Sequence, residues 1–348
     1  MDMKTARLLA VALCALAAPA HAEIPRHEVR IATPDPEVVL AGTLLVPAGA
    51  ETAVLMVTGS GGHPRDQVIS GTPMFRVIAE HLAAAGVATL RLDDRGVGES
   101  TGPAARASTT ADRVEDMRAA LRWLQGTDLG RFSRIGLLGH SEGANISARL
   151  GAGGEAVDFL ILLGAPALPG REVWVDQQLA GFRAAVGTED AALLEDVAAH
   201  LQRAVDLSVE GAPAEAMRDN TIALFALAGI DTADEEGQKL LAGFTGRMSD
   251  PWMRHFLADD PGVALGALAT PLLVVYGSHD RLTSTRANGP PLVAALAAAG
   301  NADFTLRVLP DEDHFFMRAP GRAPGEHAFG EMEMSAALLH TLTGWLQR

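Results

Sequence analysis

Strand-like and helix-like stretches alternate along most of the chain, and this rhythm constrains the fold more than any other feature. Short apolar runs such as AVLMV at 53–57 and FLILL at 159–163 are separated by longer stretches with helical spacing, as in 109–126, where Thr110 is a candidate N-cap. Strands that alternate with helices favour a mainly parallel sheet covered on both faces. We therefore predict an α/β fold built on such a sheet.

The alternation stops after Pro166 and resumes near Pro271. Between these points the sequence has helical patterns and no clear strand; the apolar residues Leu194, Leu201 and Val205, for example, share one helical face. The block is too long for a loop, so we predict a helical lid over the carboxyl ends of the strands, where open α/β sheets bind ligands. The predicted organisation is a core at 23–166 and 263–348 with an inserted lid at 167–262.

The first 22 residues have the three parts of a secretory signal peptide. Lys4 and Arg7 precede an apolar run, and Ala20-His21-Ala22 offers a small-x-small cleavage site. The run is too short to span a membrane. We expect cleavage after residue 22, export to the periplasm or the medium, and no lipid anchor. Cleavage would remove Cys14, the one cysteine, so the mature chain would hold no disulfide and no thiolate.

The composition narrows the classes of partner. The chain has 28 basic and 43 acidic residues among 348, a formal net charge of −15 at pH 7. Such a chain repels nucleic acid and anionic membrane surfaces. The sequence has no H-E-x-x-H motif, no clustered histidines and no calcium-loop pattern. We predict a small-molecule substrate, no nucleic acid, no stable membrane anchor, no metal and no cofactor.

The stretch RIGLLGHSEGANISARL places a serine between two glycines, directly after an apolar run and before a helical pattern. The order G-x-S-x-G after a strand is typical of a nucleophile elbow, in which a strained turn lifts the serine hydroxyl above the sheet. The alternative is a serine that only caps the helix. We favour Ser141 as a nucleophile and the backbone N–H of Glu142 as an oxyanion donor.

A serine hydroxyl needs a general base, and that base needs a carboxylate to orient it. In folds with this elbow the chain order is serine, acid, histidine. Asp280 follows the late strand-like run LLVVYG, and His314 follows the last one, FTLRVLP. We therefore predict the triad Ser141, Asp280 and His314.

Together these stretches resemble the α/β-hydrolase superfamily. The resemblance covers nearly all of the mature chain and rests on GHSEG, DDRGVGES, GSHD and DEDHFF. More narrowly, VTGSGG, GAPALPG and DPWMRHFLADDP are similar to exported bacterial hydrolases related to serine aminopeptidases. The resemblance implies an α/β-hydrolase fold with eight strands. It also implies Asp280 as the acid, because the neighbouring Asp311, Glu312 and Asp313 do not match the family's acid position.

The glycine-rich loop TGSGGHPRD supplies the second oxyanion donor that the resemblance implies. The family usually has His-Gly-x-Gly, and Thr58 stands where that histidine would be. The N–H of Ser60 is the best match and that of Gly61 the next. A phosphate-binding loop is the alternative, but Pro64 stands where a third glycine would be needed. We interpret DDRGVGES mainly as structure, pinned by an ion pair of Asp94 or Arg95.

The predicted activity is hydrolysis of carboxylic esters with small or medium acyl groups through an acyl-enzyme. Aminopeptidase or amidase activity is the alternative, with an acidic residue needed to bind the substrate's amine; non-catalytic binding and acyl transfer to another acceptor are further alternatives. The candidate amine-binding residues are Glu142, Asp66, Glu235 and Glu236. The candidate substrate contacts are Gly61, His63, Trp252 and Phe256.

Overall fold

The computed structural model describes residues 23–318 and 333–348, so the predicted signal peptide at 1–22 lies outside the described residues. Eight strands form one sheet in the order β1-β2-β6-β3-β7-β8-β9-β10. β2 pairs antiparallel with β1 and with β6, and all the other neighbours are parallel. The predicted eight-stranded, mainly parallel sheet is confirmed. Its strands are β1 (Arg26–Ala32), β2 (Val39–Leu45), β3 (Thr52–Val57), β6 (Ala88–Leu92), β7 (Arg134–His140), β8 (Phe159–Leu163), β9 (Leu272–Gly277) and β10 (Phe304–Leu309).

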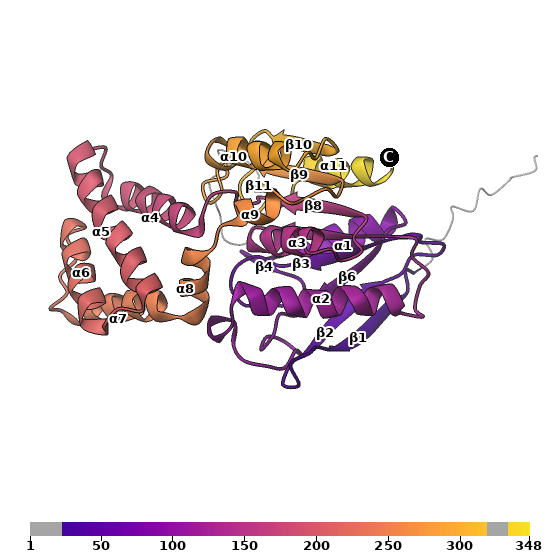
Figure 1. Ribbon diagram of the computed structural model, residues 1–348, viewed down its shortest axis with the longest axis horizontal. Coiled ribbons are helices and arrows are strands. Elements are labelled where there is room, and N and C mark those ends of the chain that lie inside the picture. The colour runs from indigo at the N-terminus through magenta and orange to yellow at the C-terminus, as the bar shows by residue number, and fades with distance from the viewer. Residues whose placement is uncertain (1–22, 319–332) are drawn as a thin grey trace, which may run out of the picture.

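Helices cover both faces of the sheet, as the alternation predicts (Figure 1). On one face the apolar side chains of β3, β7 and β8 pack against α2, α3, α9 and α10. On the other face they pack against α1 and α11. These helices are α1 (Met74–Ala84), α2 (Thr110–Gly126), α3 (Glu142–Ala152), α9 (Pro261–Leu265), α10 (Thr285–Ala298) and α11 (Ala336–Leu346).

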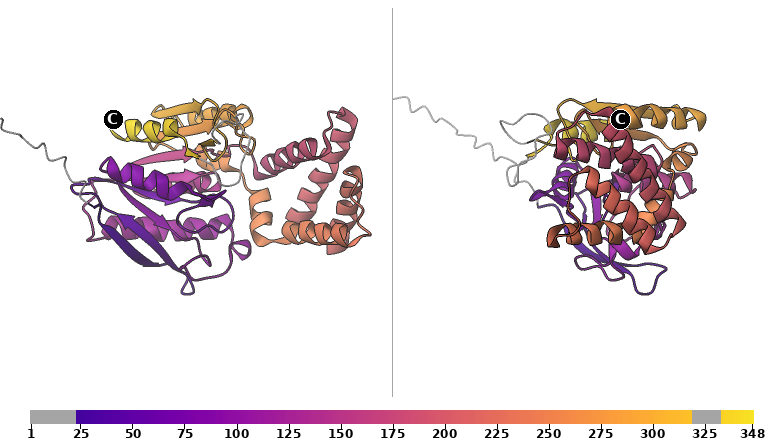
Figure 2. Two further views of the ribbon diagram at one scale, coloured as in Figure 1. Left: turned by 180° about the vertical axis from the view of Figure 1, so that it is seen from behind. Right: turned by 90° about the vertical axis from the view of Figure 1, so that its left-hand side faces the viewer.

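Five helices inserted between β8 and β9 form a separate body beside one end of the sheet (Figures 1 and 2). They have an apolar core of their own, with Trp174, Leu201 and Met248 among its buried residues. We call this insert the lid. The lid helices are α4 (Gly170–Val186), α5 (Ala191–Glu210), α6 (Ala214–Leu227), α7 (Glu235–Ser249) and α8 (Pro251–Ala258).

Short elements complete the described chain. A 3₁₀ turn, η1 (Ala105–Ala107), contacts α8 of the lid. Two small ribbons pair β4 (Val68–Ile69) with β5 (Thr72–Pro73) and β11 (Met317–Arg318) with β12 (Glu333–Met334). No helix in the described part of the chain is both long and apolar enough to cross a membrane.

The structure corrects the predicted N-cap of α2. Thr109, not Thr110, is the N-cap: its side chain accepts from the backbone N–H of Asp112, whose carboxylate accepts from the N–H of Thr109 in return. This reciprocal capping box is available only to the threonine that stands three residues before the acid. The hydroxyl of Thr110 instead donates to the carboxylate of Glu142, at 2.6 Å.

Candidate active site

Ser141 stands at the turn between β7 and α3 with φ 55° and ψ −120°, a backbone conformation that non-glycine residues rarely adopt. The flanking glycines make this turn feasible. A Cβ atom on Gly139 would collide with the backbone of Gly143, and one on Gly143 would collide with the carbonyl of Val57. Glycine is therefore needed on both sides of Ser141, which is the arrangement that the spacing predicts.

His314 and Asp280 meet at the same end of the sheet, although 34 positions separate them. Asp280 follows β9, and His314 lies in the loop after β10, the strand that pairs with β9. The Nδ1 atom of His314 lies 2.8 Å from Oδ2 of Asp280, and both residues are about 4% exposed. His314 and Ser141 line a common pocket. The structure thus brings Ser141 and His314 to one pocket, with Asp280 bonded to the histidine ring.

Thr283 is a further member of this cluster, which sequence reasoning missed. Its hydroxyl lies 2.8 Å from Oδ2 of Asp280 and 3.1 Å from Nδ1 of His314, while its backbone N–H donates to Oδ1 of Asp280. Burial alone would raise the pKa of Asp280, but His314 and these hydrogen bonds hold it below its usual value. The carboxylate is therefore ionised at neutral pH and can orient the imidazole.

The neighbouring acids have other partners. Oδ1 of Asp313 accepts from the backbone N–H groups of Phe315 and Met317, and so holds the turn that follows His314. Glu312 accepts a 2.6 Å hydrogen bond from the hydroxyl of Ser335 at the start of α11. Asp280 is the acid that bonds to the His314 ring, at 2.8 Å from Nδ1.

His140, the variable residue of the elbow motif, connects two loops of the site. Its Nδ1 lies 2.7 Å from the amide nitrogen of Gln67, and its Nε2 lies 3.0 Å from the backbone oxygen of His314. Burial and the nearby His314 ring lower the pKa of His140 to about 3. A neutral ring that accepts from Gln67 at Nδ1 must donate from Nε2, so His140 supports the backbone of His314.

The glycine-rich loop lies beside Ser141 and presents Ser60 to the same space. The backbone N–H of Gly59 donates to Oε1 of Gln67 at 3.2 Å, so it is already engaged. The next N–H along the loop belongs to Ser60, which lines the pocket with Ser141. Glu142 is the first residue of α3, and the N–H groups of a first turn have no partner within the helix. These two N–H groups are the predicted oxyanion donors.

Behind these two loops lies a buried cluster of charges centred on Arg113 of α2. Its guanidinium donates to the carbonyls of Thr58 and Gly59 and to the carboxylate of Glu142. Thr110 also donates to Glu142, at 2.6 Å. Burial would lower the pKa of Arg113, but Asp94 and Glu142 raise it. Arg113 therefore ties the glycine-rich loop to the start of α3 while it remains charged.

The DDRGVGES segment is structural, as interpreted. Arg95 forms a buried pair with Asp116 of α2, with 2.7 Å between Nε and Oδ2. Asp94 accepts from the Thr58 hydroxyl and from the backbone N–H of His63. Thr58, which replaces the histidine usual in the family, therefore serves to join the glycine-rich loop to this segment.

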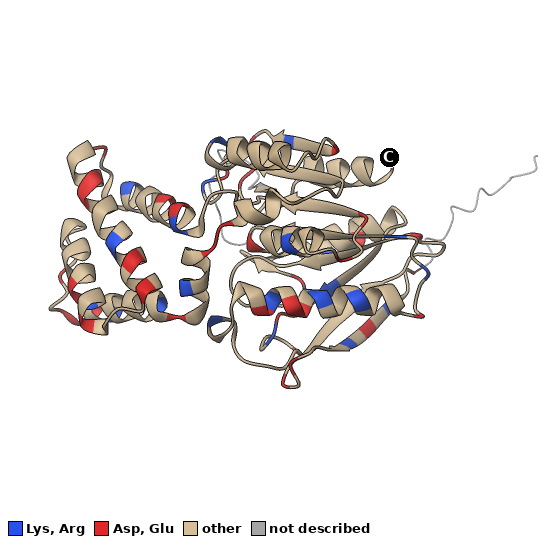
Figure 3. Ribbon diagram, in the orientation of Figure 1, with Lys and Arg blue, Asp and Glu red and all other residues tan. Residues whose placement is uncertain are grey.

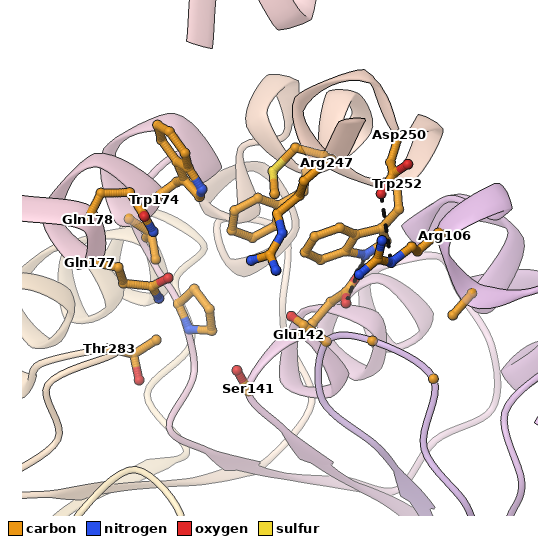
Figure 4. Close-up of a pocket in the computed structure, with 18 residues that line it drawn as sticks. Arg106, Ser141, Glu142, Trp174, Gln177, Gln178, Arg247, Asp250, Trp252 and Thr283 are labelled. Atoms are coloured by element: carbon orange, nitrogen blue, oxygen red, sulfur yellow. Dashed lines mark hydrogen bonds and ion pairs between the residues drawn. The ribbon is translucent and has the colours of Figure 1, made fainter. Parts of the chain in front are cut away.

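A pocket of about 440 Å³ lies between the core and the lid above Ser141 (Figure 4). Core residues Ser60, Gly61 and Glu142 line its base, and lid residues Trp252 and Phe256 line its upper wall. The two aromatic rings stack 5.3 Å apart, and the indole N–H of Trp252 donates to the carboxylate of Glu142 at 3.1 Å. Three of the four predicted substrate contacts, Gly61, Trp252 and Phe256, therefore line this pocket.

His63 lies by a second, smaller pocket of about 230 Å³, together with Gln67, His140 and His314. Its Nε2 lies 2.9 Å from the backbone oxygen of Ser60. Ser60, Ser141 and Gln177 line both pockets, so Ser141 stands where the two spaces meet. Among the described residues, no group of three or more His, Cys, Asp and Glu side chains is placed to hold a metal ion.

This fold and this arrangement belong to a known class: the chain is a member of the alpha/beta hydrolase fold family, whose model matches residues 52–317. It is 31% identical over 140 residues to the esterase EstD of Thermotoga maritima, a match that covers 40% of this chain and 33% of EstD. The chain thus spans about a third of the length of that relative.

Solved structures share the fold at much lower identity. The Pyrococcus furiosus esterase Pf2001 matches with a TM-score of 0.54 and 17% identity over 84% of each chain. The alpha/beta hydrolase GrgF from Penicillium sp. sh18 matches with a TM-score of 0.53 and 16% identity over 84% of this chain and 91% of its own. Likeness at this level establishes the architecture and leaves the substrate open.

Proposed function

We propose that this protein is a serine hydrolase that cleaves carboxylic esters of small or medium acyl groups, with Ser141 as nucleophile, His314 as base and Asp280 as orienting acid. The observation that carries the proposal is the 2.8 Å bond from His314 to Asp280 at a pocket that also contains the strained Ser141. The similarity of the chain to EstD, an esterase, supports the choice of substrate class.

The chemistry follows from the placement of these groups. His314 donates from Nδ1 to Asp280, so its Nε2 is the unprotonated nitrogen that takes the proton of the serine hydroxyl. The serine oxygen attacks the ester carbonyl, and the N–H groups of Glu142 and Ser60 bind the oxyanion. His314 then gives its proton to the leaving alcohol, and water, activated by the same base, releases the acid from Ser141.

The aminopeptidase alternative has weaker support, because the candidate amine-binding carboxylates are engaged or distant. Glu142 is bound by Arg113 and Trp252, and Asp66 pairs with the buried Arg91. Glu235 pairs with Lys239, at 2.7 Å, on the exposed start of α7, beside Glu236, and neither acid lines either pocket described above. An ester substrate needs no such carboxylate, and its leaving group is the easier one to expel.

We also propose that the protein is exported, on the signal-peptide pattern of residues 1–22. Lys and Arg are interspersed with Asp and Glu over core and lid in the part of the chain that the structure describes (Figure 3). This distribution suits a small-molecule substrate better than a polyanion. Sequencing the N-terminus of the protein recovered from the periplasm tests export, and an unprocessed cytoplasmic chain would contradict it.

The activity is tested by turnover of 4-nitrophenyl esters from acetate to dodecanoate, beside aminoacyl 4-nitroanilides, with the mature chain and its Ser141→Ala variant. Removing the nucleophile of a triad reduces turnover by roughly a million-fold, so ester turnover is expected to vanish in the variant. Cleavage of the anilides alone would favour the peptidase alternative. Equal turnover by both proteins would rule out Ser141 as the nucleophile.

A further inference from the structure

If the protein is the esterase proposed above, the two pockets that meet at Ser141 determine which part of the ester lies on which side of the serine. His314 lines the smaller pocket and not the larger one. The histidine must reach the leaving oxygen to protonate it, so the alcohol part of the ester lies on the side of the smaller pocket. The acyl part then extends into the larger pocket, between the core and the lid.

Four charged residues line that larger pocket, and three of them have partners. Glu142 is held by Arg113, Thr110 and Trp252, as described above. Asp250 lies 3.9 Å from Arg106. The fourth is Arg247, near the end of α7, whose guanidinium has neither a hydrogen bond nor an ion pair with any residue that the structure describes.

The side chain of Arg247 points into the larger pocket. In Figure 4 its guanidinium extends from the lid into the pocket, between Trp174 and Trp252, on the side that faces Ser141. Trp174 is 5% exposed and packs against Phe244 of the same helix as Arg247, so the wall beside the guanidinium is apolar and well packed. The Arg247 side chain is itself exposed, and the planar donor geometry of its guanidinium matches the two oxygens of a carboxylate.

We propose that Arg247 binds a carboxylate at the far end of the acyl group, so that the preferred substrates are half-esters of dicarboxylic acids. The reaction remains the hydrolysis described above. The ester C–O bond breaks, the acyl–Ser141 bond forms and is then cleaved by water, and the alcohol leaves with the proton from His314. The product is the free dicarboxylate, whose distal carboxylate takes no part in the chemistry. A substrate with a free ammonium in this pocket would be repelled by the same charge.

The test compares two esters of equal acyl length, the 4-nitrophenyl monoester of adipic acid and 4-nitrophenyl hexanoate. Wild type is expected to prefer the adipate ester, and the ratio of the two kcat/KM values is expected to fall about tenfold in Arg247→Gln, because one charge-assisted pair is lost. Arg247→Lys, which keeps the charge but loses the planar pair of N–H donors, should retain part of the preference. High salt should weaken the preference in wild type.

Lys239→Gln is the matched control, since it removes one positive charge from the exposed surface of the same helix. It is expected to leave the adipate-to-hexanoate ratio as in wild type. A second pair of esters tests whether Arg247 recognises a charge on the alcohol part. The pair is 4-acetoxybenzoate, which carries its carboxylate on the alcohol, and 4-nitrophenyl acetate. That ratio is expected to be equal in wild type and Arg247→Gln. A response to the charge on the alcohol and not on the acyl chain would overturn the proposal, as would an unchanged adipate-to-hexanoate ratio.

A binding measurement separates this proposal from the proposed function. Ser141→Ala is titrated calorimetrically with adipamate, which carries the carboxylate but no ester, and with hexanamide. Tighter binding of adipamate that is lost in the Ser141→Ala, Arg247→Gln double variant supports the carboxylate site even if no ester is hydrolysed. Equal binding of the two amides would overturn the site even if simple esters are good substrates.

Discussion

The core half and the lid half of the pocket are held in different ways. On the core side, Asp280, His314, His140 and Arg113 are all buried, and each makes at least two hydrogen bonds to neighbouring loops. On the lid side, Trp252 makes one polar contact with the core and Arg247 makes none among the described residues. In the proposed reaction, the groups that hold the reacting atoms are therefore fixed in place, whereas Arg247 is free to pair with the rest of a substrate.

The largest expected effect comes from the core. Asp280→Asn should keep the fold but lower kcat by about ten-thousandfold, because an amide favours the wrong tautomer of His314. Asp311→Asn is the control: Asp311 is exposed, close to His314 in sequence, and has a positive φ that asparagine tolerates. If Asp311→Asn lost as much activity as Asp280→Asn, the assignment of the acid would be wrong. Steady-state turnover of one good ester decides this.

Removing the buried cation Arg113, which joins the glycine-rich loop to the start of α3, should destabilise the core. Arg113→Met leaves Glu142 and Asp94 buried without their shared partner, and breaking a buried pair in this way costs about 3 to 5 kcal/mol. Arg122→Met on the same helix removes an exposed pair with Glu155 and should cost less than about 0.5 kcal/mol. Urea unfolding of both variants measures the difference. Equal destabilisation would show that the cluster adds nothing to the core.

A third test uses the neutral ring of His140. Its pKa is about 3 in the folded chain and about 6.5 in an unfolded one, so stability from this ring is complete above pH 6.5 and is lost as the pH falls toward 3. Between pH 7.5 and pH 5, wild type should lose about 2 kcal/mol more than His140→Gln, which has no proton to bind. Urea unfolding at both pH values measures this, and parallel losses would contradict a buried neutral ring.

The smallest effect is expected on the lid side. Trp252→Phe removes the indole donor to Glu142 and keeps an aromatic ring against Phe256, so it should cost about 1 kcal/mol at most. The expected result is a severalfold rise in KM for esters with long acyl groups and little change in kcat. A fall in kcat comparable to that of Asp280→Asn would mean that the lid contact is part of the catalytic machinery.

The sequence could predict what depends on local pattern. Glycine spacing around Ser141 reports a backbone constraint that no other residue type satisfies, and the order of strands places Asp280 and His314 at one end of a parallel sheet. The helical character of the insert was equally visible, because its apolar residues recur with helical spacing.

The sequence could not predict contacts between residues that are distant in the chain. Thr283, Gln67 and Arg113 carry no motif; each matters because of which loop its side chain reaches. His140 looked like a variable position, and its bonds to Gln67 and His314 join segments 73 and 174 positions away. The lid residues could be named as aromatic candidates, but only the fold brings Trp252 to Glu142 and leaves Arg247 unpaired.

In the proposed reaction Ser141, which the core holds in place, is the group that takes the acyl chain. The most direct measurement is covalent labelling of the protein with paraoxon, a phosphate ester that reacts with activated serines, followed by peptide mass spectrometry. We expect one diethylphosphoryl group on the peptide that contains Ser141, loss of ester turnover in proportion to labelling, and no adduct in Ser141→Ala. A labelled residue elsewhere, or an unlabelled protein that still hydrolyses esters, would contradict this role of Ser141.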